Sequence, residues 1–523
     1  MAGQQFVTFG LGSQPFGNVP AWALDQNFND ATNFPATTQI RVAADTRIPR
    51  SHTQKLADWV SVKDFGAKGD GVTDDTFAFN NAQIYANSIN ASVYLPSPDA
   101  FYLLAGTVTV LTSMRGTGYA TVIKTSSATA DVFQITDPGC VLEDFWLTST
   151  VTRTAGYFIN SIGVNYTRLQ RLGLINWFNG VGLTGGACTT FRLVDCSMST
   201  NVVGGIGVTI STAVNAVDVL LRDVYIVGPT SGAQCAAGIQ VTNVGDLTLE
   251  HVETVKCGTG FNIQPGAGQV IQCLYCSNSL FDSGSGTGVQ FNMQSTGTVQ
   301  LAKFVNCWAV TNANGFVLSA SSAGTCTNAE FINCIGSNNV GGVGFQIVHS
   351  GVTNTNVIGG SYALNAYGVY INTSVTRFNL MGIRIGASGQ FGNNTINGLV
   401  LAGSNDQFTI LGCDVTNNAT PYAITAPVGG TPGQTWYIKD CPGIVTSSGG
   451  QATLTSAATT TTVTHGLAGT PRLQDVTITP NSGAGTGVFY AVTSVTATNF
   501  VITAQANPGA GVLMGWNARL WGA

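Results

Sequence analysis

The sequence of this 523-residue chain is poor in charge: Asp, Glu, Lys and Arg make up 9% of it, and the net charge is −5. Ordinary globular chains carry about 25% charged residues, so long helices with salt-bridged faces are not expected. No cluster of Lys and Arg forms a nucleic-acid-binding patch, and no apolar run approaches the roughly 20 residues of a membrane span. The first residues, MAGQQFVTFG, lack the basic and apolar regions of a signal peptide. We therefore expect neither nucleic-acid binding nor membrane insertion.

The twelve cysteines do not have the spacing of a metal site. Cys273 and Cys276 form a lone C-x-x-C, with no second pair and no pair of histidines nearby. Inward-facing cysteine packs as a small hydrophobe, and free thiols are typical of folding in a reducing cytosol. Six cysteines recur at or near one position of a repeat: Cys196, Cys276, Cys307, Cys334, Cys413 and Cys441.

A motif of the form Gly-apolar-x-apolar recurs nine times over residues 180–401. Its glycines lie 22 to 33 residues apart, so the repeat has no fixed length. Variable spacing suits a coil of short strands whose connecting loops differ in length. The motifs begin at Gly180, Gly205, Gly238, Gly260, Gly288, Gly315, Gly344, Gly368 and Gly398.

A second strand pattern lies between the glycine motifs, as in Leu193-Val194-Asp195-Cys196. Alternation places its apolar residues on one face. The Asp, Asn or Gly at its third position marks a sharp bend, because these residues best tolerate left-handed backbone angles. Each repeat is then one turn with at least two strands. The sequence predicts an all-β fold, a right-handed single-stranded parallel β-helix (solenoid) of about eleven turns.

The most specific motif precedes the coil, where residues 60–76 read VSVKDFGAKGDGVTDDT. It predicts a strand, a glycine-rich bend and a helix that covers the end of the coil. Together with residues 53–59 (TQKLADW), it closely resembles the pectate-lyase-superfamily segment that opens the right-handed β-helix of bacteriophage tailspikes and tail fibres. The apolar face expected for the helix comprises Phe79, Ala82, Ala86 and Ile89.

This resemblance implies a homotrimeric protein of the virion tail, assembled in the bacterial host cytoplasm, that binds and often cleaves bacterial surface polysaccharide. It also implies that residues 1–52 dock on tail or baseplate proteins; the alternative is that they fold back on the β-helix. Asp70, Asp74 and Asp75 miss the spacing of a calcium loop, so we expect them to act as caps and in turns. We expect no metal and no cofactor.

The composition changes again after Cys441. Residues 446–464, rich in Ser, Gly and Thr, are interpreted as a linker or a weak edge strand, and the alternating runs that follow predict a small antiparallel β-sandwich. Its apolar end, with Trp516 and Trp521, predicts trimerisation, and a carbohydrate-binding module is the alternative. The predicted domains are the attachment segment 1–52, the capping segment 53–105, the β-helix 106–445, the linker 446–464 and the C-terminal domain 465–523.

Two functional classes fit the β-helix. One is a depolymerase, a glycoside hydrolase or polysaccharide lyase, and the other is a receptor-binding fibre that holds glycan without cutting it. Hydrolysis needs two carboxylates beside the glycosidic bond, and lyase chemistry needs a base and a cation. The aspartates of the bend column, Asp144, Asp195, Asp223 and Asp440, are interpreted as turn residues. The chain has four glutamates: Glu143, Glu250, Glu253 and Glu330.

Stacking the turns in register places the candidate site residues in two outward columns. Glu253, beside Tyr225, is the predicted general acid because a carboxyl against aromatic rings tends to have a raised pKa, and Asp282 is its predicted partner. Glu250, expected to pair with Arg222, and Glu330 are the fallback catalytic residues. Trp146, Tyr225 and Trp308 are predicted to stack on sugar rings; the alternative is that all these are solvated surface residues. The columns are Glu143, Gln170, Val194, Arg222 and Glu250, and then Trp146, Gly173, Ser197, Tyr225, Glu253, Ser277 and Trp308.

Overall fold

The structure is a computed structural model that describes residues 59–321, 323–372, 374–386, 392–402, 405–424, 436–482, 488–508 and 511–520, together with four short strands nearer the N-terminus. These four form two antiparallel pairs, β1 (Phe6–Val7) with β2 (Val19–Pro20) and β3 (Gln39–Ile40) with β4 (Arg50–Ser51). They belong to a separate N-terminal unit that ends at Val60. Residues 22–28, for which the sequence predicts a short helix, lie outside the described residues.

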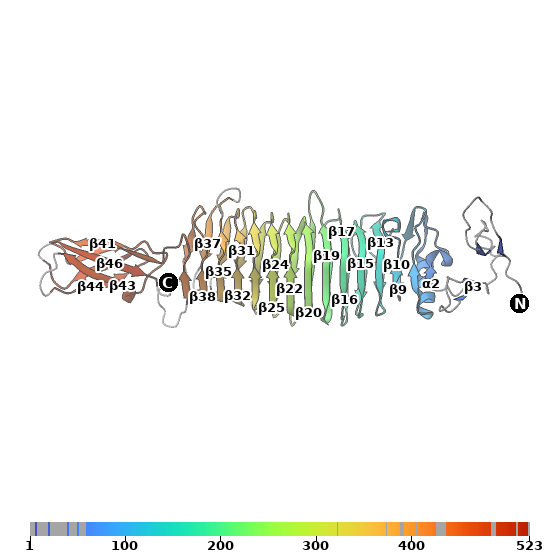
Figure 1. Cartoon of the computed structure of the whole chain (residues 1–523), viewed down its shortest axis with the longest axis horizontal. Coiled ribbons are helices and arrows are strands. Elements are labelled where there is room, and N and C mark those ends of the chain that lie inside the picture. The colour runs from blue at the N-terminus through green and yellow to red at the C-terminus, as the bar shows by residue number, and fades with distance from the viewer. Residues whose placement is uncertain are drawn as a thin grey trace. The chain divides into compact units, whose positions relative to one another are not determined.

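The main unit winds into a parallel β-helix of about 13 turns rather than the eleven expected (Figure 1). The strands of the turns lie on three faces, and within the coil they pair in parallel with the strands one turn before and one turn after. Strands β13 (Val141–Ser149), β15 (Arg168–Ile175), β17 (Arg192–Ser199) and β19 (Val219–Val227) run through the first and second faces, and β20 (Cys235–Val255) runs through all three.

The remaining strands each belong to one face. The first face holds β7 (Ser92–Tyr94), β10 (Met114–Arg115), β22 (Val270–Ser277), β25 (Thr298–Val305), β28 (Thr325–Thr327), β29 (Ala329–Ile332), β32 (Val352–Ile358), β35 (Thr376–Met381), β38 (Asp406–Leu411) and β40 (Trp436–Lys439). The second holds β6 (Asp70–Asp74), β8 (Phe101–Leu104), β11 (Val122–Thr125), β23 (Leu280–Asp282), β26 (Trp308–Val310), β30 (Ile335–Ser337), β33 (Ser361–Tyr362) and β36 (Arg384–Ile385). The third holds β9 (Val108–Val110), β12 (Phe133–Ile135), β14 (Tyr157–Ile162), β16 (Asn179–Gly185), β18 (Ile206–Ala216), β21 (Cys257–Ile263), β24 (Thr287–Met293), β27 (Asn314–Ala320), β31 (Val343–Ile347), β34 (Tyr367–Ile371), β37 (Asn397–Leu401) and β39 (Tyr422–Ile424).

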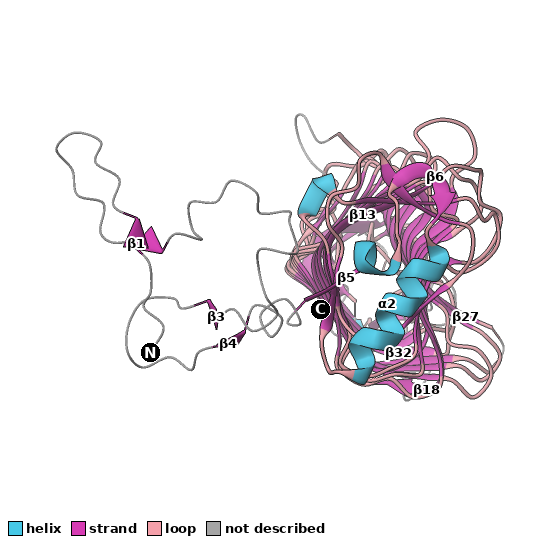
Figure 2. Cartoon of the chain, turned by 90° about the vertical axis from the view of Figure 1, so that its right-hand side faces the viewer, coloured by secondary structure: helices cyan, strands magenta, loops and turns pink. Residues whose placement is uncertain are grey.

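Helix α2 (Thr76–Ser88) lies across the end of the coil, beside the 3-10 helix η2 (Val62–Phe65) (Figure 2). Its buried side chains cover the interior of the first turn, as the sequence predicted, except that Ile89 lies beyond the last helical residue and is exposed. No helix in the described part of the chain is both long and apolar enough to cross a membrane. The buried residues of α2 are Ala78, Phe79, Ala82, Gln83 and Ala86.

The three aspartates before α2 act as caps and in turns, as expected. Asp70 accepts hydrogen bonds from the backbone of Val72 and Thr73, and those bonds, the one from Thr73 first, lower the pKa of Asp70 to about 2. Asp74 accepts from the backbone N–H of Thr76 at 3.0 Å. Buried Asp75 accepts from the backbone N–H of Lys68 at 2.6 Å, so it fixes the glycine-rich bend against the helix.

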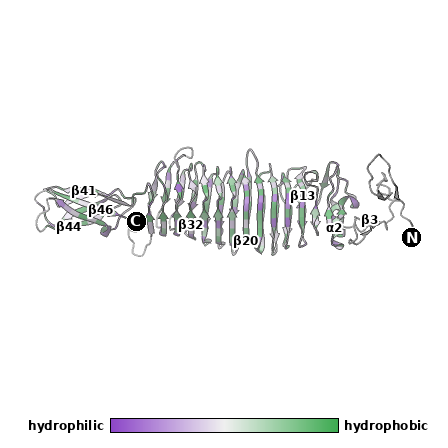
Figure 3. Cartoon of the chain, viewed as in Figure 1, coloured by the Kyte–Doolittle hydropathy of each residue, from purple (hydrophilic) through white to green (hydrophobic). Residues whose placement is uncertain are grey.

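The glycine motifs form the strands of the third face. The apolar residues after the glycines stack in register, and hydrophobic and hydrophilic residues are mixed along the strands (Figure 3). The glycine is required by close approach, since a Cβ on Gly238 would lie 2.7 Å from the carbonyl oxygen of Gly260 one turn on. One repeat was assigned wrongly. Val181 pairs with Val208, so the glycine equivalent to Gly180 is Gly207 and not Gly205. Gly205 and Gly207 are two residues apart and each precedes an apolar residue, so both fit the motif.

A bend with left-handed backbone separates the first and second faces in every turn from β13 to β40. The predicted Asp, Asn or Gly positions all have positive φ, for example 54° at Asp195 and 54° at Asn306. We call this column the corner. Its residues are Asp144, Arg171, Asp195, Asp223, His251, Asn278, Asn306, Asn333, Gly359, Gly382, Gly412 and Asp440.

The C-terminal part consists of two antiparallel three-stranded sheets, joined by the 3-10 helix η5 (Leu473–Asp475). One has the order β41 (Ser447–Leu454), β46 (Val512–Arg519), β43 (Val476–Ser482), and the other β42 (Thr460–Thr464), β45 (Asn499–Ala504), β44 (Tyr490–Val495). Residues 446–464 are therefore not a linker, because they contain edge strands of both sheets. The Trp516 ring lies 5.3 Å from that of Phe500, which engages it inside this part; Trp521 lies outside the described residues.

All twelve cysteines are free, and all except Cys273 are buried. Burial raises the pKa of the Cys326 thiol to about 12 and that of Cys276 well above its ordinary value. We expect Cys307 and Cys334 to stay reduced and unlabelled by a thiol reagent in the native protein, with Cys273 reacting first. Mass spectrometry of labelled peptides checks this, and rapid native labelling at Cys307 or Cys334 would contradict it.

Asparagine side chains form an interior ladder between the second and third faces that the sequence analysis missed. Asn339 donates to Asn365 at 3.0 Å, Asn365 to Asn394 at 3.3 Å, and Asn394 to Asn418 at 2.7 Å. Asn365 also accepts from the backbone N–H of Asn339 at 3.0 Å. Each amide satisfies buried polar groups of a neighbouring turn, so the ladder fixes the register of the bend between the second and third faces.

We expect Asn365→Ala to lower the free energy of unfolding by roughly 2–4 kcal/mol, because buried partners on two neighbouring turns lose their hydrogen bonds. Denaturant unfolding followed by circular dichroism measures the change. Asn356→Ala is the matched control, since it removes an outward amide that accepts from Asn379, and it should lower stability by less than about 1 kcal/mol. Equal effects of the two substitutions would contradict the role of the ladder.

Candidate functional site

The corner and the second face position the residues of the candidate site. Because turns stack at about 4.8 Å, residues at one position form a column parallel to the coil axis. The first predicted column is confirmed along its whole length, from Glu143 to Glu250. The second is confirmed from Trp146 to Glu253, but Glu253 pairs with Leu280 rather than Ser277, which pairs with Glu250. Trp308 pairs with Leu280, so it belongs to this column, as predicted, although Leu280 and not Ser277 precedes it.

A groove of about 360 Å³ runs along this column beside the corner. Trp146 and Tyr225 lie three turns apart in the column and bound the groove, while small Gly173 and Ser197 lie between them. The Trp146 indole covers Gly173, where a Cβ would come within 2.6 Å of the ring. The ring of Tyr119 lies 4.9 Å from that of Trp146 and extends the aromatic end. Two of the three predicted stacking residues, Trp146 and Tyr225, therefore line one groove.

The corner side of the groove is charged. Arg171 Nε lies 2.6 Å from Asp144, and Arg171 Nη2 lies 2.5 Å from Glu143, which also accepts from Gln170. Hydrogen bonding between the side chains of Arg171 and Asp144 lowers the pKa of Asp144 and raises the pKa of Arg171. Glu143 is thus a member of an ion-pair cluster.

Two further carboxylates line the groove, Asp195 and Asp223. Asp223 Oδ2 lies 3.5 Å from Arg222 and Asp223 Oδ1 lies 3.6 Å from His251. Within the described ranges Asp195 forms no ion pair and is exposed, so its carboxylate is free to accept a hydrogen bond from a hydroxyl group of a ligand. Sequence analysis set both aside as bend residues. Both are bend residues, because their backbones have the positive φ of the corner. Their side chains also line the groove, so one residue can form the bend and contribute to the groove surface.

Glu253 lies one strand beyond Tyr225 in the same column. Burial raises the pKa of Glu253, and the nearby carboxylate of Asp282 raises it further. Asp282 pairs with Val255, so it lies diagonally from Glu253 on the next strand of the second face. Glu253 and Asp282 therefore lie on neighbouring strands in the turns that follow Tyr225, and neither is among the residues that line the groove.

A loop from two turns earlier fixes the chain beside Asp282. Gln234 donates from Nε2 to the carbonyl of Ser283 at 3.1 Å and accepts from the N–H of Ser285 at 2.7 Å. The carbonyl of Asp282 itself accepts from the N–H of Lys256 at 3.0 Å. The two Gln234 contacts join segments about fifty residues apart, and no pattern in the sequence points to them.

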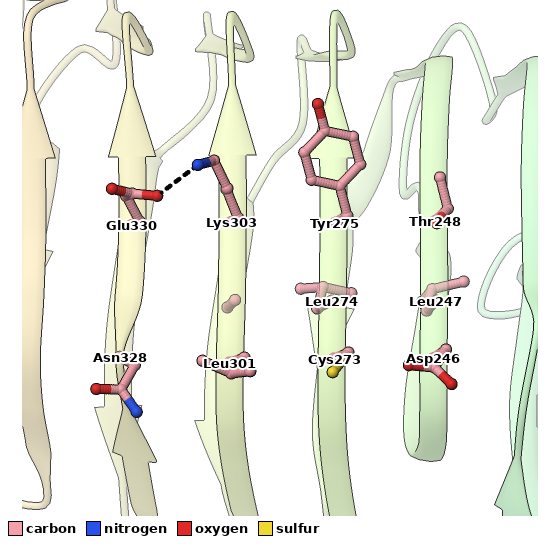
Figure 4. Close-up of a pocket in the computed structure, with 11 residues that line it drawn as sticks. Asp246, Leu247, Thr248, Cys273, Leu274, Tyr275, Leu301, Lys303, Asn328 and Glu330 are labelled. Atoms are coloured by element: carbon pink, nitrogen blue, oxygen red, sulfur yellow. Dashed lines mark ion pairs between the residues drawn. The ribbon is translucent and has the colours of Figure 1, made fainter.

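The fallback glutamates lie elsewhere. Glu250 is in register with Arg222, as predicted, but the expected ion pair is wrong, because the acid within 4.0 Å of Arg222 is Asp223. Glu330 lies on the first face, where Lys303 Nζ is 2.8 Å from its carboxylate and has a raised pKa from that hydrogen bond (Figure 4). It borders a recess of about 310 Å³ that also holds Tyr275 and the exposed Cys273.

No group of three or more His, Cys, Asp or Glu side chains within the described part of the chain is arranged to hold a metal ion. The residues that line the groove supply carboxyl groups, aromatic faces and hydrogen-bonding side chains.

Comparison with known proteins agrees with this architecture. Residues 59–280 match the family model described as rhamnogalacturonase A/epimerase, pectate lyase-like. No curated protein matches the chain.

Several solved structures share the fold at low sequence identity. A tailspike variant of Escherichia coli bacteriophage HK620, solved in complex with a pentasaccharide, is 11% identical, with a TM-score of 0.54 over 93% of this chain and 98% of that one. Tailspike protein 3 of bacteriophage CBA120 is 15% identical, with a TM-score of 0.50 over 83% of this chain and 70% of that one. The A-module of a mannuronan C-5 epimerase from Azotobacter vinelandii is 16% identical, with a TM-score of 0.53 over 68% and 98%. The chain therefore has a pectate-lyase-like right-handed β-helix of the kind found in phage tailspikes, as the motif at residues 60–76 indicated.

Proposed function

We propose that this chain is a tailspike that binds a bacterial surface polysaccharide along its second face and cleaves it. The observation that carries the proposal is the Glu253–Asp282 pair, in which burial and the Asp282 charge raise the pKa of Glu253, next to a groove bounded by Trp146 and Tyr225. The pentasaccharide in the HK620 tailspike supports a glycan as the ligand.

The chemistry follows from the two carboxyl groups. A general acid must carry a proton, and the raised pKa of Glu253 favours its protonated form. In this role Glu253 would protonate the oxygen of the leaving sugar. Asp282, as a carboxylate, would act as base or nucleophile on the other side of the bond. Trp146, Tyr225 and exposed Trp308 would hold sugar rings on either side of the acid, so that the chain of sugars runs parallel to the coil axis.

The proposal includes the setting of the protein. Residues 1–52 attach the chain to tail or baseplate proteins of the virion, and three copies assemble through the C-terminal sheets and the β-helix. Trp516 is engaged by Phe500, which favours a structural role for the C-terminal part over a second carbohydrate module.

Loss of an aromatic side chain should weaken binding without altering the fold. We expect Trp146→Ala and Tyr225→Ala each to raise the Kd for the polysaccharide about tenfold, corresponding to roughly 1.4 kcal/mol of lost stacking. Surface plasmon resonance on immobilised capsular, lipopolysaccharide and exopolysaccharide preparations measures it. Tyr275→Ala is the matched control, since Tyr275 is 41% exposed on the first face and Tyr225 is 42% exposed on the second. A similar loss in the control would argue against the groove.

Removing either carboxyl should stop cleavage. We expect Glu253→Gln and Asp282→Asn each to lower the rate of oligosaccharide release at least about 100-fold. The residual activity of Asp282→Asn should also show an altered pH profile. Without the Asp282 charge the pKa of Glu253 falls, so the upper limb of the profile, where the acid loses its proton, moves to lower pH.

Release of new reducing ends or unsaturated sugars from the same polysaccharides measures the rates and distinguishes a hydrolase from a lyase. Glu330→Gln makes the same chemical change at an ion-paired glutamate and should leave the rate unchanged. Rates within a factor of about ten of the unsubstituted protein for both site variants would place catalysis elsewhere. Tight binding with no product from any polysaccharide would instead support the alternative function, a receptor-binding fibre that holds glycan without cutting it.

A further inference from the structure

The charged residues that line the groove are mostly acids. They are Asp144, Arg171, Asp195 and Asp223, and all four are corner residues with positive φ. At one strand spacing per turn this row extends for about 14 Å, because three turns separate its first member from its last. Three turns also separate the aromatic rings of Trp146 and Tyr225. Sugars that lie between the two rings therefore pass the whole row of charges.

The arginines beside the groove are already paired with acids of the protein. Arg171 donates to Asp144 twice, from Nε at 2.6 Å and from Nη2 at 2.9 Å. Arg115 Nε lies 3.4 Å from Asp144, and Arg222 Nε lies 3.5 Å from Asp223. A carboxylate of a sugar could bind these guanidinium groups only by competing with a carboxylate of the protein.

Asp195 makes the balance of charge negative. It lies between Arg171 and Asp223 in the corner, it is exposed, and it has no ion-pair partner among the residues that the structure describes. Exposed Ser197 lies two residues further along the same strand and also lines the groove. A carboxylate accepts hydrogen bonds from hydroxyl groups and repels an anion. The groove therefore offers acceptors, a hydroxyl group and aromatic faces, while the arginines next to it are occupied.

We infer that the groove takes a polysaccharide of neutral sugars, which carry no carboxyl group, rather than a uronic-acid polymer. The neutral substrate is a property of the same groove and so rests on the proposed function. Hydroxyl groups of a neutral sugar match the acceptors of Asp195 and Asp223, and its C–H faces can pack on Trp146 and Tyr225. A sugar carboxylate in the same place would lie beside Asp195 without a cation of its own, and such juxtaposed like charges weaken binding.

A neutral substrate also decides between the two proposed reactions. A lyase removes a proton next to a carboxyl group, which a neutral sugar lacks. In hydrolysis, Glu253 gives its proton to the leaving oxygen, the anomeric carbon takes the hydroxyl group of water, and the other proton of that water returns to the pair of Glu253 and Asp282. The products are two sugar chains, one of which has a new reducing end and neither of which is unsaturated.

Binding of the full chain to matched charged and uncharged polysaccharides tests this inference. The probes are uronic-acid-containing capsular and exopolysaccharide preparations, each in native and carboxyl-reduced form, and neutral O-polysaccharides freed from lipopolysaccharide. Carboxyl reduction turns each uronic acid into a neutral sugar and keeps the linkages. We expect the tightest ligand to be uncharged, to release reducing ends without unsaturated sugars, and to have a Kd that changes less than about threefold between roughly 0.05 and 0.5 M salt, because salt screens only interactions between charges.

Asp195→Asn keeps the shape of the side chain and removes its charge. We expect it to raise the Kd for the tightest polysaccharide at least about fivefold, because a charged acceptor is lost. Asp440→Asn is the matched control, since Asp440 is an exposed corner residue with φ of 53° that lies several turns beyond the groove, and it should leave the Kd unchanged. Circular dichroism establishes the fold of both variants. An unchanged Kd or tighter binding in Asp195→Asn would overturn the inference, and tighter binding would show that the Asp195 carboxylate repels the ligand.

The remaining results separate the substrate class from the proposed function itself. A uronic-acid polysaccharide that loses at least about tenfold in affinity on carboxyl reduction would overturn the neutral substrate and leave glycan binding intact. Unsaturated products, or a Kd that changes more than about tenfold with salt, would do the same. If no preparation binds in either form, the proposed function is wrong and the neutral substrate is wrong with it.

Discussion

The left-handed bend between the first and second faces is the constraint on which the rest of this structure depends. It recurs once per turn from Asp144 to Asp440, always with positive φ. Since side chains alternate along a strand, one misplaced bend would turn every inward residue of the next strand outward. The bend therefore decides at once which residues fill the interior and which form the outer columns. The asparagine ladder around Asn365 performs the same task between the second and third faces.

This constraint explains why much of the fold could be predicted from the sequence. Alternation and the Asp, Asn or Gly of the bend are local signals, so the order of residues in the columns from Glu143 to Glu250 and from Trp146 to Glu253 followed from them. The two errors of register arose where the local signal was ambiguous. Gly205 and Gly207 both fit the motif, and Ser277 was aligned across the bend at Asn278, although it lies before that bend.

The candidate site was predictable only in part, for a different physical reason. Glu253 and Asp282 meet because of backbone register, which the repeat determines. The partners of long side chains depend on rotamers and loops. Arg222 reaches Asp223 on its own strand rather than Glu250 on the next, and Gln234 reaches residues two turns away. The roles of Asp195 and Asp223 in the groove were missed because a bend residue was taken to have a single role.

The interior and exterior of the β-helix obey separate rules, which is how one repeat can serve two purposes. Inside, every turn must supply apolar groups or mutually bonded amides at fixed positions, so the sequence there is restricted along the whole coil. Outside, register fixes the place of a side chain but not its chemistry. The same corner can thus carry Asp195 and Asp223 beside the groove and, several turns later, Gly382 and Gly412 beside the outward side chains of Met381 and Leu411.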